Sequence, residues 1–303
     1  MGSPSKPDAP RSADRHPHEP RDPVQLRIVD QDRGATVTLP DTGERCCSLT
    51  VVNQDNYINR VLHEPGEHHL TMEEFDTRHV MLGVRILVDP NDPADVDVVN
   101  ELQDQLVINA DSDEPVTMSD YDAESFTSVR EALLVLAATI HGYERAFGRR
   151  EDVDPIRHLL ATAAGWGGLP DHEAIYLNVS PQTTVGEYEI VVGDVPVDAF
   201  WSISVYKAHG FFAPSERGAC SINSVTAHRE PGGSVVVHLG ACADEQPNCL
   251  HVMDGWNYTV RLYRPTRRDP QRIMALLFPA ACRWRVTALA REHECVDVRL
   301  GTD

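Results

Sequence analysis

The spacing of apolar residues divides the chain into a strand-rich first part, a helical middle and a strand-rich second part. In the first part, short alternating or continuous apolar runs predict strands at residues 35–39, 47–52 and 79–88. A helix is expected from residue 93 to about residue 107, because Asp92 can cap it and a proline follows at its first position. The first part is therefore expected to be mainly β-structure.

The middle of the chain has the period of an α-helix. Residues 128–131 (SVRE) have the pattern of a capping box and begin a series of apolar residues at steps of four and three. This apolar stripe consists of Val129, Leu133, Leu136, Ile140, Tyr143 and Phe147. A second helix is expected to start at Asp154 and Pro155 and to end at glycines near residue 165. These patterns predict a helical hairpin whose first helix runs from about residue 128 to Gly148.

After Pro170 the period changes to two residues, which is typical of β-strands. Strands are predicted at residues 174–179, 187–192, 200–206, 220–223, 234–239 and 257–263. Turn residues separate these strands at intervals typical of a sandwich or barrel, and residues 230–233 (EPGG) suit a hairpin turn.

One strand has two faces of different character. Trp201, Ile203 and Val205 would point to one side of the sheet, and Ser202, Ser204 and Tyr206 to the other. Because antiparallel sheets commonly expose one face to water, we favour a solvent-exposed second face. The alternative is a concave sheet that faces a ligand.

The sequence therefore predicts a β-rich α+β fold with two antiparallel β-sandwich parts joined by a helical hairpin. We divide the chain into a polar, disordered tail (1–24), an N-terminal β-rich part (25–118), the helical hairpin (119–170) and a C-terminal β-sandwich (171–303).

The charge of the chain excludes some classes of partner. It has 47 acidic and 27 basic residues and a formal net charge of −20. Binding to nucleic acid needs a basic surface that releases counterions, and an anionic membrane surface would repel this chain. No apolar run approaches the roughly 18 residues that a membrane helix needs. We expect neither nucleic acid nor a membrane as partner.

The cysteines and the N-terminus predict a compartment. No apolar segment of a secretory signal follows Met1, and the seven cysteines form no C-x-x-C pair. Reduced cysteines in a cytoplasmic protein are therefore expected, without a disulfide framework or a zinc site.

Known catalytic motifs are mostly absent. The chain has no nucleophile elbow, P-loop or zinc-protease helix motif. Residues 63–69 (HEPGEHH) are rich in metal-ligand types, but Pro65 and Gly66 prevent the helix that the zinc motif requires. We expect no metal and no cofactor, and histidines that bind a metal are the least favoured alternative.

Several motifs of the second part resemble the family called "domain of unknown function 1214". Residues 200–206 (FWSISVY) resemble the FWS-x-x-x-Y strand of that family, residues 220–223 (CSIN) its Tyr-Ser-Ile-Asn segment, and residues 261–265 (RLYRP) its Arg-x-Tyr-x-Pro ending. Residues 51–57 (VVNQDNY) are similar to a shortened version of the partner family, "domain of unknown function 1254".

The resemblance implies a fold more than an activity. Proteins of this type look like two jelly-roll-like β-sandwiches joined by helices. Cys249 and His251 depart from the family, which has tryptophan and proline in the corresponding Asn-Trp-Leu-Pro segment. If that segment lines a pocket, the ligand here is expected to differ.

Seven residues of the second part are candidates for a site. We predict Tyr206, His209 and Arg261 as catalytic residues, and Trp201, Asn223, His238 and Asn248 as ligand-binding residues. Histidine suits proton transfer near neutral pH, and arginine can bind a carboxylate through two N–H groups. For Arg261, a structural salt bridge is the stronger expectation in so acidic a chain.

Two classes of function remain open. One is a small-molecule enzyme of hydrolase or lyase type with a pocket in the C-terminal sandwich, in which case at least three of the polar candidates should converge on one cavity. The other is a non-catalytic module on a jelly-roll scaffold that binds a small molecule or takes part in assembly. A homo-oligomer is compatible with either class.

Overall fold

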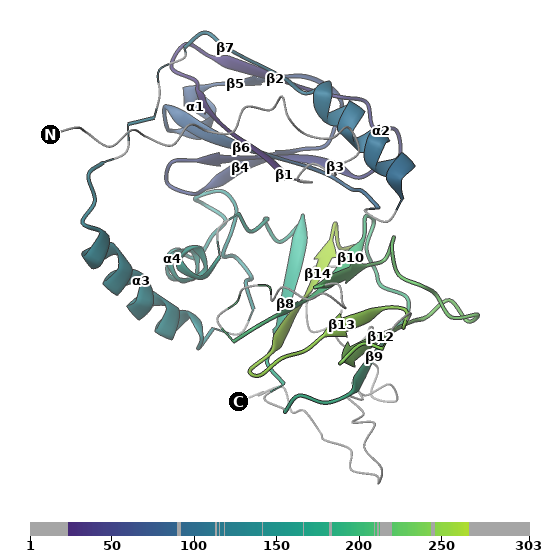
Figure 1. Ribbon diagram of the computed structural model, residues 1–303. Coiled ribbons are helices and arrows are strands. Elements are labelled where there is room, and N and C mark those ends of the chain that lie inside the picture. Colours follow the sequence, from purple (N-terminus) through teal and green to yellow (C-terminus); the bar gives the residue numbers. More distant parts are fainter. Residues whose placement is uncertain are drawn as a thin grey trace, which may run out of the picture.

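The computed structural model contains two β-rich halves with a pair of helices between them (Figure 1). It describes residues 24–266 apart from residues 90, 91, 113, 115, 118, 141, 166, 182, 183, 209, 211, 213–219, 244 and 245. The tail predicted at residues 1–24 therefore lies almost entirely outside the described residues.

The first half consists of two antiparallel sheets. The larger sheet has the strand order β1-β6-β3-β4, formed by Val24–Asp30, His79–Ile86, Cys47–Asn53 and Ile58–Leu62. The smaller sheet has the order β5-β2-β7, formed by Gly66–Leu70, Ala35–Leu39 and Val107–Ala110. Apolar side chains from both sheets form one core, in which Leu49, Val51 and Leu70 are fully buried.

Two helices belong to this half. The short helix α1 (Met72–Phe75) buries Phe75 completely. Helix α2 (Pro93–Asp104) begins as predicted, since the Asp92 side chain caps it by accepting a hydrogen bond from the backbone N–H of Ala94. Val99 of α2 is buried in the core of this half.

The first helix of the predicted hairpin differs from the expectation. Helix α3 spans Ala123–Ala137, and its cap is Asp122 rather than Ser128. It buries none of its residues, and Gly142 has a positive φ of 83° that an α-helix does not allow. The predicted apolar stripe is therefore split, because Tyr143 and Phe147 lie beyond the helix and only Phe147 is buried.

The second helix confirms the local prediction. Helix α4 spans Pro155–Ala164, with Asp154 accepting hydrogen bonds from the N–H groups of Ile156 and Arg157 and with Gly165 at its end. Helices α3 and α4 contact each other and lie between the halves (Figure 1).

The second half is also built from two sheets. The larger sheet has the order β11-β10-β14-β8, formed by Ser221–Asn223, Trp201–Tyr206, Asn257–Tyr263 and Ala174–Val179. The smaller sheet has the order β13-β12-β9, formed by Cys249–His251, Val235–Gly240 and Tyr188–Val192. Their facing apolar side chains form a second core that includes Trp201, Ile203 and Leu262. One pair departs from the predicted antiparallel pattern, since β12 and β13 run parallel.

A disulfide corrects the prediction of reduced cysteines. Cys242 and Cys249 are bonded to each other, with their Cα atoms 5.5 Å apart. Cys249 lies on β13 and Cys242 follows β12, so the parallel pairing brings the two residues together. Sequence spacing alone does not reveal this, because a chain reversal within seven residues is needed. Cys46 and Cys47 are free thiols.

Among the described residues, no helix is both long and apolar enough to cross a lipid bilayer.

Candidate functional site

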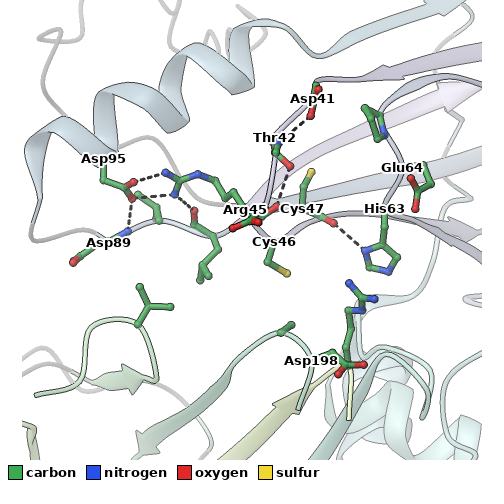
Figure 2. Close-up of a pocket in the computed structure, with 18 of the residues that line it drawn as sticks. Asp41, Thr42, Arg45, Cys46, Cys47, His63, Glu64, Asp89, Asp95 and Asp198 are labelled. Atoms are coloured by element: carbon green, nitrogen blue, oxygen red, sulfur yellow. Dashed lines mark hydrogen bonds and ion pairs between the residues drawn. The ribbon is translucent and has the colours of Figure 1, made fainter. Parts of the chain in front are cut away.

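A cleft of about 780 Å³ lies where the two halves meet (Figure 2). One wall comes from the first half, mainly from the segment of residues 41–47, the turn of residues 63–65 and the segment that leads into α2. The other wall comes from the second half: Asp198, Ala199, Val225 and Arg264. Figure 2 shows Arg45, Cys46 and His63 on the first wall and Asp198 across from them.

Arg45 holds the first wall together. Its guanidinium binds both carboxylate oxygens of Asp95 and donates a hydrogen bond of 2.6 Å to the carbonyl oxygen of Leu87. Asp95 also accepts a hydrogen bond of 2.8 Å from the N–H of Asp89. The hydrogen bond from Arg45 holds the pKa of Asp95 below its usual value. This network ties the start of α2 to the segment before β3.

His63 joins the two halves at one end of the cleft. Its Nδ1 lies 2.9 Å from the carbonyl oxygen of Cys47, and its Nε2 lies 2.9 Å from a carboxylate oxygen of Glu173, just before β8. A carbonyl and a carboxylate both accept hydrogen bonds, so the imidazolium form of His63 satisfies both contacts at once.

The pKa shifts of His63 and Glu173 are consistent with a protonated His63 beside a charged Glu173. The hydrogen bond to Glu173 raises the pKa of His63, against the opposing effect of burial. Burial works against the charged form of Glu173, but the hydrogen bond from His63 and the nearby charges of His172 and Arg264 outweigh it, so the pKa of Glu173 is lowered. Both groups are therefore stabilised in their charged forms.

The ends of β8 and β14 bring the groups of the second half into place. The N–H of Arg264 donates a hydrogen bond of 2.8 Å to the carbonyl oxygen of Glu173, and the N–H of Asp198 donates one of 2.8 Å to the carbonyl oxygen of Arg264. These backbone contacts place Arg264 and Asp198 at the cleft and Glu173 beside His63.

The two adjacent cysteines of the first wall are not activated thiols. Burial raises the pKa of Cys47 to about 11, and burial also raises the pKa of Cys46 against the opposing charge of Arg264. Since the thiolate is the nucleophilic form, neither cysteine has the lowered pKa of a catalytic thiol.

The cleft is rich in negative charge. Its lining carboxylates belong to Asp41, Glu44, Glu64, Asp89, Asp92, Asp95 and Asp198. Arg45 and Arg264 are the arginines among the lining residues, and Arg45 already pairs with Asp95. A cationic group would therefore meet a favourable potential in this cleft. Nowhere in the described part of the chain do three or more histidine, cysteine or acidic side chains gather as metal ligands would.

None of the six predicted site residues that the structure describes lines this cleft. The structure brings two of them together, since Arg261 donates a hydrogen bond of 2.5 Å to the hydroxyl oxygen of Tyr206. His209 lies outside the described residues. Trp201 is 4% exposed and belongs to the second core.

The other three predicted residues lie apart and make local contacts. Asn223 accepts hydrogen bonds from the N–H groups of Val225 and Thr226 in the turn after β11. The side chain of Asn248 exchanges hydrogen bonds of 2.7 Å with both backbone groups of His228. His238 lies on the smaller sheet, 3.4 Å from a carboxylate oxygen of Glu189.

The residues that build the cleft carry little local signal in the sequence. His63 belongs to the histidine-rich run, but its partner Glu173 is 110 residues away. Cys46 and Cys47 are conspicuous only as neighbours. Their common location depends on how the two halves pack.

Comparison with known proteins identifies part of the second half. Residues 178–267 match the family described as "Protein of unknown function (DUF1214)". This segment is a DUF1214 domain. The match confirms the resemblance carried by the strand motifs, and the resemblance of the first half to the partner family stays a prediction. The DUF1214 domain contributes Asp198, Ala199, Val225 and Arg264 to the cleft, and the opposite wall lies outside it.

Two solved structures are similar to this chain over most of its length. The VPA0106 protein from Vibrio parahaemolyticus has 16% sequence identity and a TM-score of 0.62, over 80% of this chain and 84% of that one. An uncharacterised protein from Burkholderia cenocepacia has 14% identity and a TM-score of 0.49, over 84% of this chain and 77% of that one. At such identity the first likeness shows the fold alone. Among curated proteins, none matches.

Proposed function

We propose that this protein binds a small polar molecule with a cationic group in the cleft between its halves. The observation that carries the proposal is the cleft itself. Its volume of about 780 Å³ falls in the range of small-molecule sites, and both halves supply its walls. The excess of carboxylates over arginines among its lining residues favours a cation over an anion.

Binding is favoured over covalent catalysis because the cleft has no activated nucleophile among its described residues. The thiol pKa values of Cys46 and Cys47 are raised. Both ring nitrogens of His63 are engaged, one by the carbonyl oxygen of Cys47 and one by Glu173. His63 is therefore poorly placed to accept a proton from a ligand.

Isothermal titration calorimetry with 1,4-diaminobutane as the cationic probe tests the proposal, with succinate as the anionic counterpart. Glu64→Gln and Asp198→Asn remove one carboxylate from each wall without changing the size of the side chain. Asp194→Asn is the matched control, since Asp194 is exposed and does not line the cleft.

We expect saturable binding of the diamine and none of succinate. Each wall substitution should lower the affinity for the diamine by about two- to fivefold, because an exposed ion pair contributes roughly 0.5–1 kcal/mol. Asp194→Asn should leave the affinity unchanged. Absence of diamine binding, or equal affinities in all three variants, would contradict the proposal.

An enzyme of hydrolase or lyase type is a second candidate, favoured by the contact between Tyr206 and Arg261. From the sequence, at least three polar candidates were expected to converge on one cavity, but Asn223 and His238 do not lie with Tyr206 and Arg261. Turnover of a model ester that is lost in both Tyr206→Phe and Arg261→Gln, with the fold retained, would support it. We also keep the jelly-roll description of the two halves as a proposal, supported by their paired sheets.

A further inference from the structure

One face of the larger sheet of the second half carries a cluster of polar side chains. Trp201 and Ile203 of β10 point into the second core, so Ser202 and Ser204 point to the opposite face. These serines are nevertheless buried, with exposed fractions of 8% and 3%. The favoured prediction of a solvent-exposed second face therefore does not hold at these two positions.

Arg261 of β14 lies at the centre of this cluster and binds only uncharged partners. Its Nη1 donates a hydrogen bond of 2.9 Å to the hydroxyl oxygen of Ser204, and its Nη2 donates one of 2.5 Å to Tyr206. No carboxylate among the described residues forms an ion pair with it. The structural salt bridge expected from the acidic composition is thus not what holds Arg261.

The hydroxyl protons of the cluster can be assigned from their acceptors. Ser221 donates to the carbonyl oxygen of Ile203 at 3.2 Å, so the contact of 2.9 Å between Ser204 and Ser221 is donated by Ser204. Ser204 then accepts from Arg261. On this side of the guanidinium, Nη1 donates one of its two hydrogens to Ser204.

On the side of Nη2 and Tyr206, hydrogen-bond donors remain without a described acceptor. The oxygen of Tyr206 accepts from Nη2 of Arg261, so the hydroxyl hydrogen of Tyr206 must point elsewhere. No acceptor for it occurs in the described part of the chain, and Nη2 carries a second hydrogen. Two donors on adjacent atoms, one of them on a cation, suit the two oxygens of a carboxylate.

A second arginine adds positive charge from the first half. Arg85 of β6 donates to the hydroxyl of Thr50 and the carbonyl of Gly167, which are also uncharged. Burial raises the pKa of Tyr176 to about 12, and the charges of both Arg85 and Arg261 act on it in the opposite direction. Both arginines therefore lie within electrostatic range of the same tyrosine.

Solvent can reach the cluster. Arg261 and Tyr206 are half-buried, and Ser221 on the edge strand β11 is exposed. Arg261 and Tyr206 thus keep part of their surface in contact with solvent. A half-buried cation without a counter-charge gains more from a bound anion than a fully hydrated one does.

We propose that Arg261 and Tyr206 bind the carboxylate group of a small organic acid on this face of the DUF1214 domain, with Arg85 contributing long-range attraction. A planar carboxylate fits here because its two oxygens can accept from two neighbouring hydrogens, one on Nη2 of Arg261 and one on the hydroxyl of Tyr206. The site shares no residue with the cleft, so it does not rest on the cation binding proposed there.

The test is calorimetric titration of the full chain with benzoate at constant ionic strength, and in parallel with inorganic phosphate. Arg261→Gln removes the charge, and Tyr206→Phe removes only the hydroxyl. Arg229→Gln is the matched control, because Arg229 is an exposed arginine of the same domain whose hydrogen bonds go to backbone carbonyls.

We expect saturable binding of benzoate that weakens about tenfold or more in Arg261→Gln and about threefold or more in Tyr206→Phe. Arg229→Gln should keep the affinity of the unsubstituted chain. If Arg261→Gln does not fold, Tyr206→Phe decides, since it keeps the ring in place. Three results would overturn the proposal: no benzoate binding, benzoate binding insensitive to Tyr206→Phe, or phosphate binding that is tighter than benzoate binding.

Discussion

The contact between His63 and Glu173 should make the stability of the protein depend on pH in a defined direction. The pKa of His63 is raised in the folded state, and the unfolded value is about 6.5. A raised pKa means that the folded chain binds this proton more tightly than the unfolded chain. The stabilisation is therefore complete below about pH 6.5 and is lost as the pH rises through the folded pKa.

The size of the effect follows from the burial of the pair. The side chains of His63 and Glu173 are 25% and 12% exposed, and a hydrogen bond to a charged group contributes about 1.5–3 kcal/mol. Partial exposure places this pair at the lower end, at about 1.5 kcal/mol. His63→Gln should lower the free energy of unfolding by this amount at mildly acidic pH and by much less at alkaline pH.

Urea unfolding followed by circular dichroism, at several values between about pH 5.5 and 8.5, measures this difference. His69→Gln is the matched control, because the His69 side chain is 75% exposed and lies 3.7 Å from its acidic neighbour Glu67. That control should follow the unsubstituted chain at every pH. Parallel curves for the unsubstituted chain and His63→Gln would refute the reasoning, because they would mean that no extra proton is held at this contact.

Two further predictions concern stability. Gly168→Ala should destabilise the fold by about 1–3 kcal/mol in thermal or urea unfolding, because a Cβ at Gly168 would overlap the buried ring of Phe147. The matched substitution Gly165→Ala, where no atom lies within 4 Å, should change stability by less than about 0.5 kcal/mol, and equal effects at both sites would contradict this packing. Reduction of the Cys242–Cys249 disulfide, seven residues apart, should cost roughly 2.5 kcal/mol of unfolding free energy, and mass spectrometry that finds both thiols free in the protein as purified would contradict the pairing.

Local chemistry was enough to predict many of the elements. Asp92 and Asp154 cap α2 and α4 as expected, because a cap depends on one side chain and the backbone N–H groups next to it. Strands β2, β8 and β14 have the predicted bounds. Burial alternates along β2 and β14 with the period of two residues that the sequence shows directly.

Helix α3 shows where local pattern was insufficient. The capping box at residue 128 was plausible, but Asp122 provides a cap six residues earlier, and the helix continues through the predicted start. The apolar stripe predicted that one face of this helix would pack against another part of the protein. In the structure Val129 and Leu136 are 57% and 54% exposed, because burial depends on what packs against a helix and not on its own period.

The sequence by itself thus determined the β-rich halves, the helical pair, the DUF1214 domain and the acidic composition. Only the tertiary structure decided the sites. His63 meets Glu173 across 110 residues, and Arg261 meets Tyr206 across 55. The physical reason is range: capping and periodicity act within a few residues, whereas a cleft or a cluster of charges forms only when distant strands pack together.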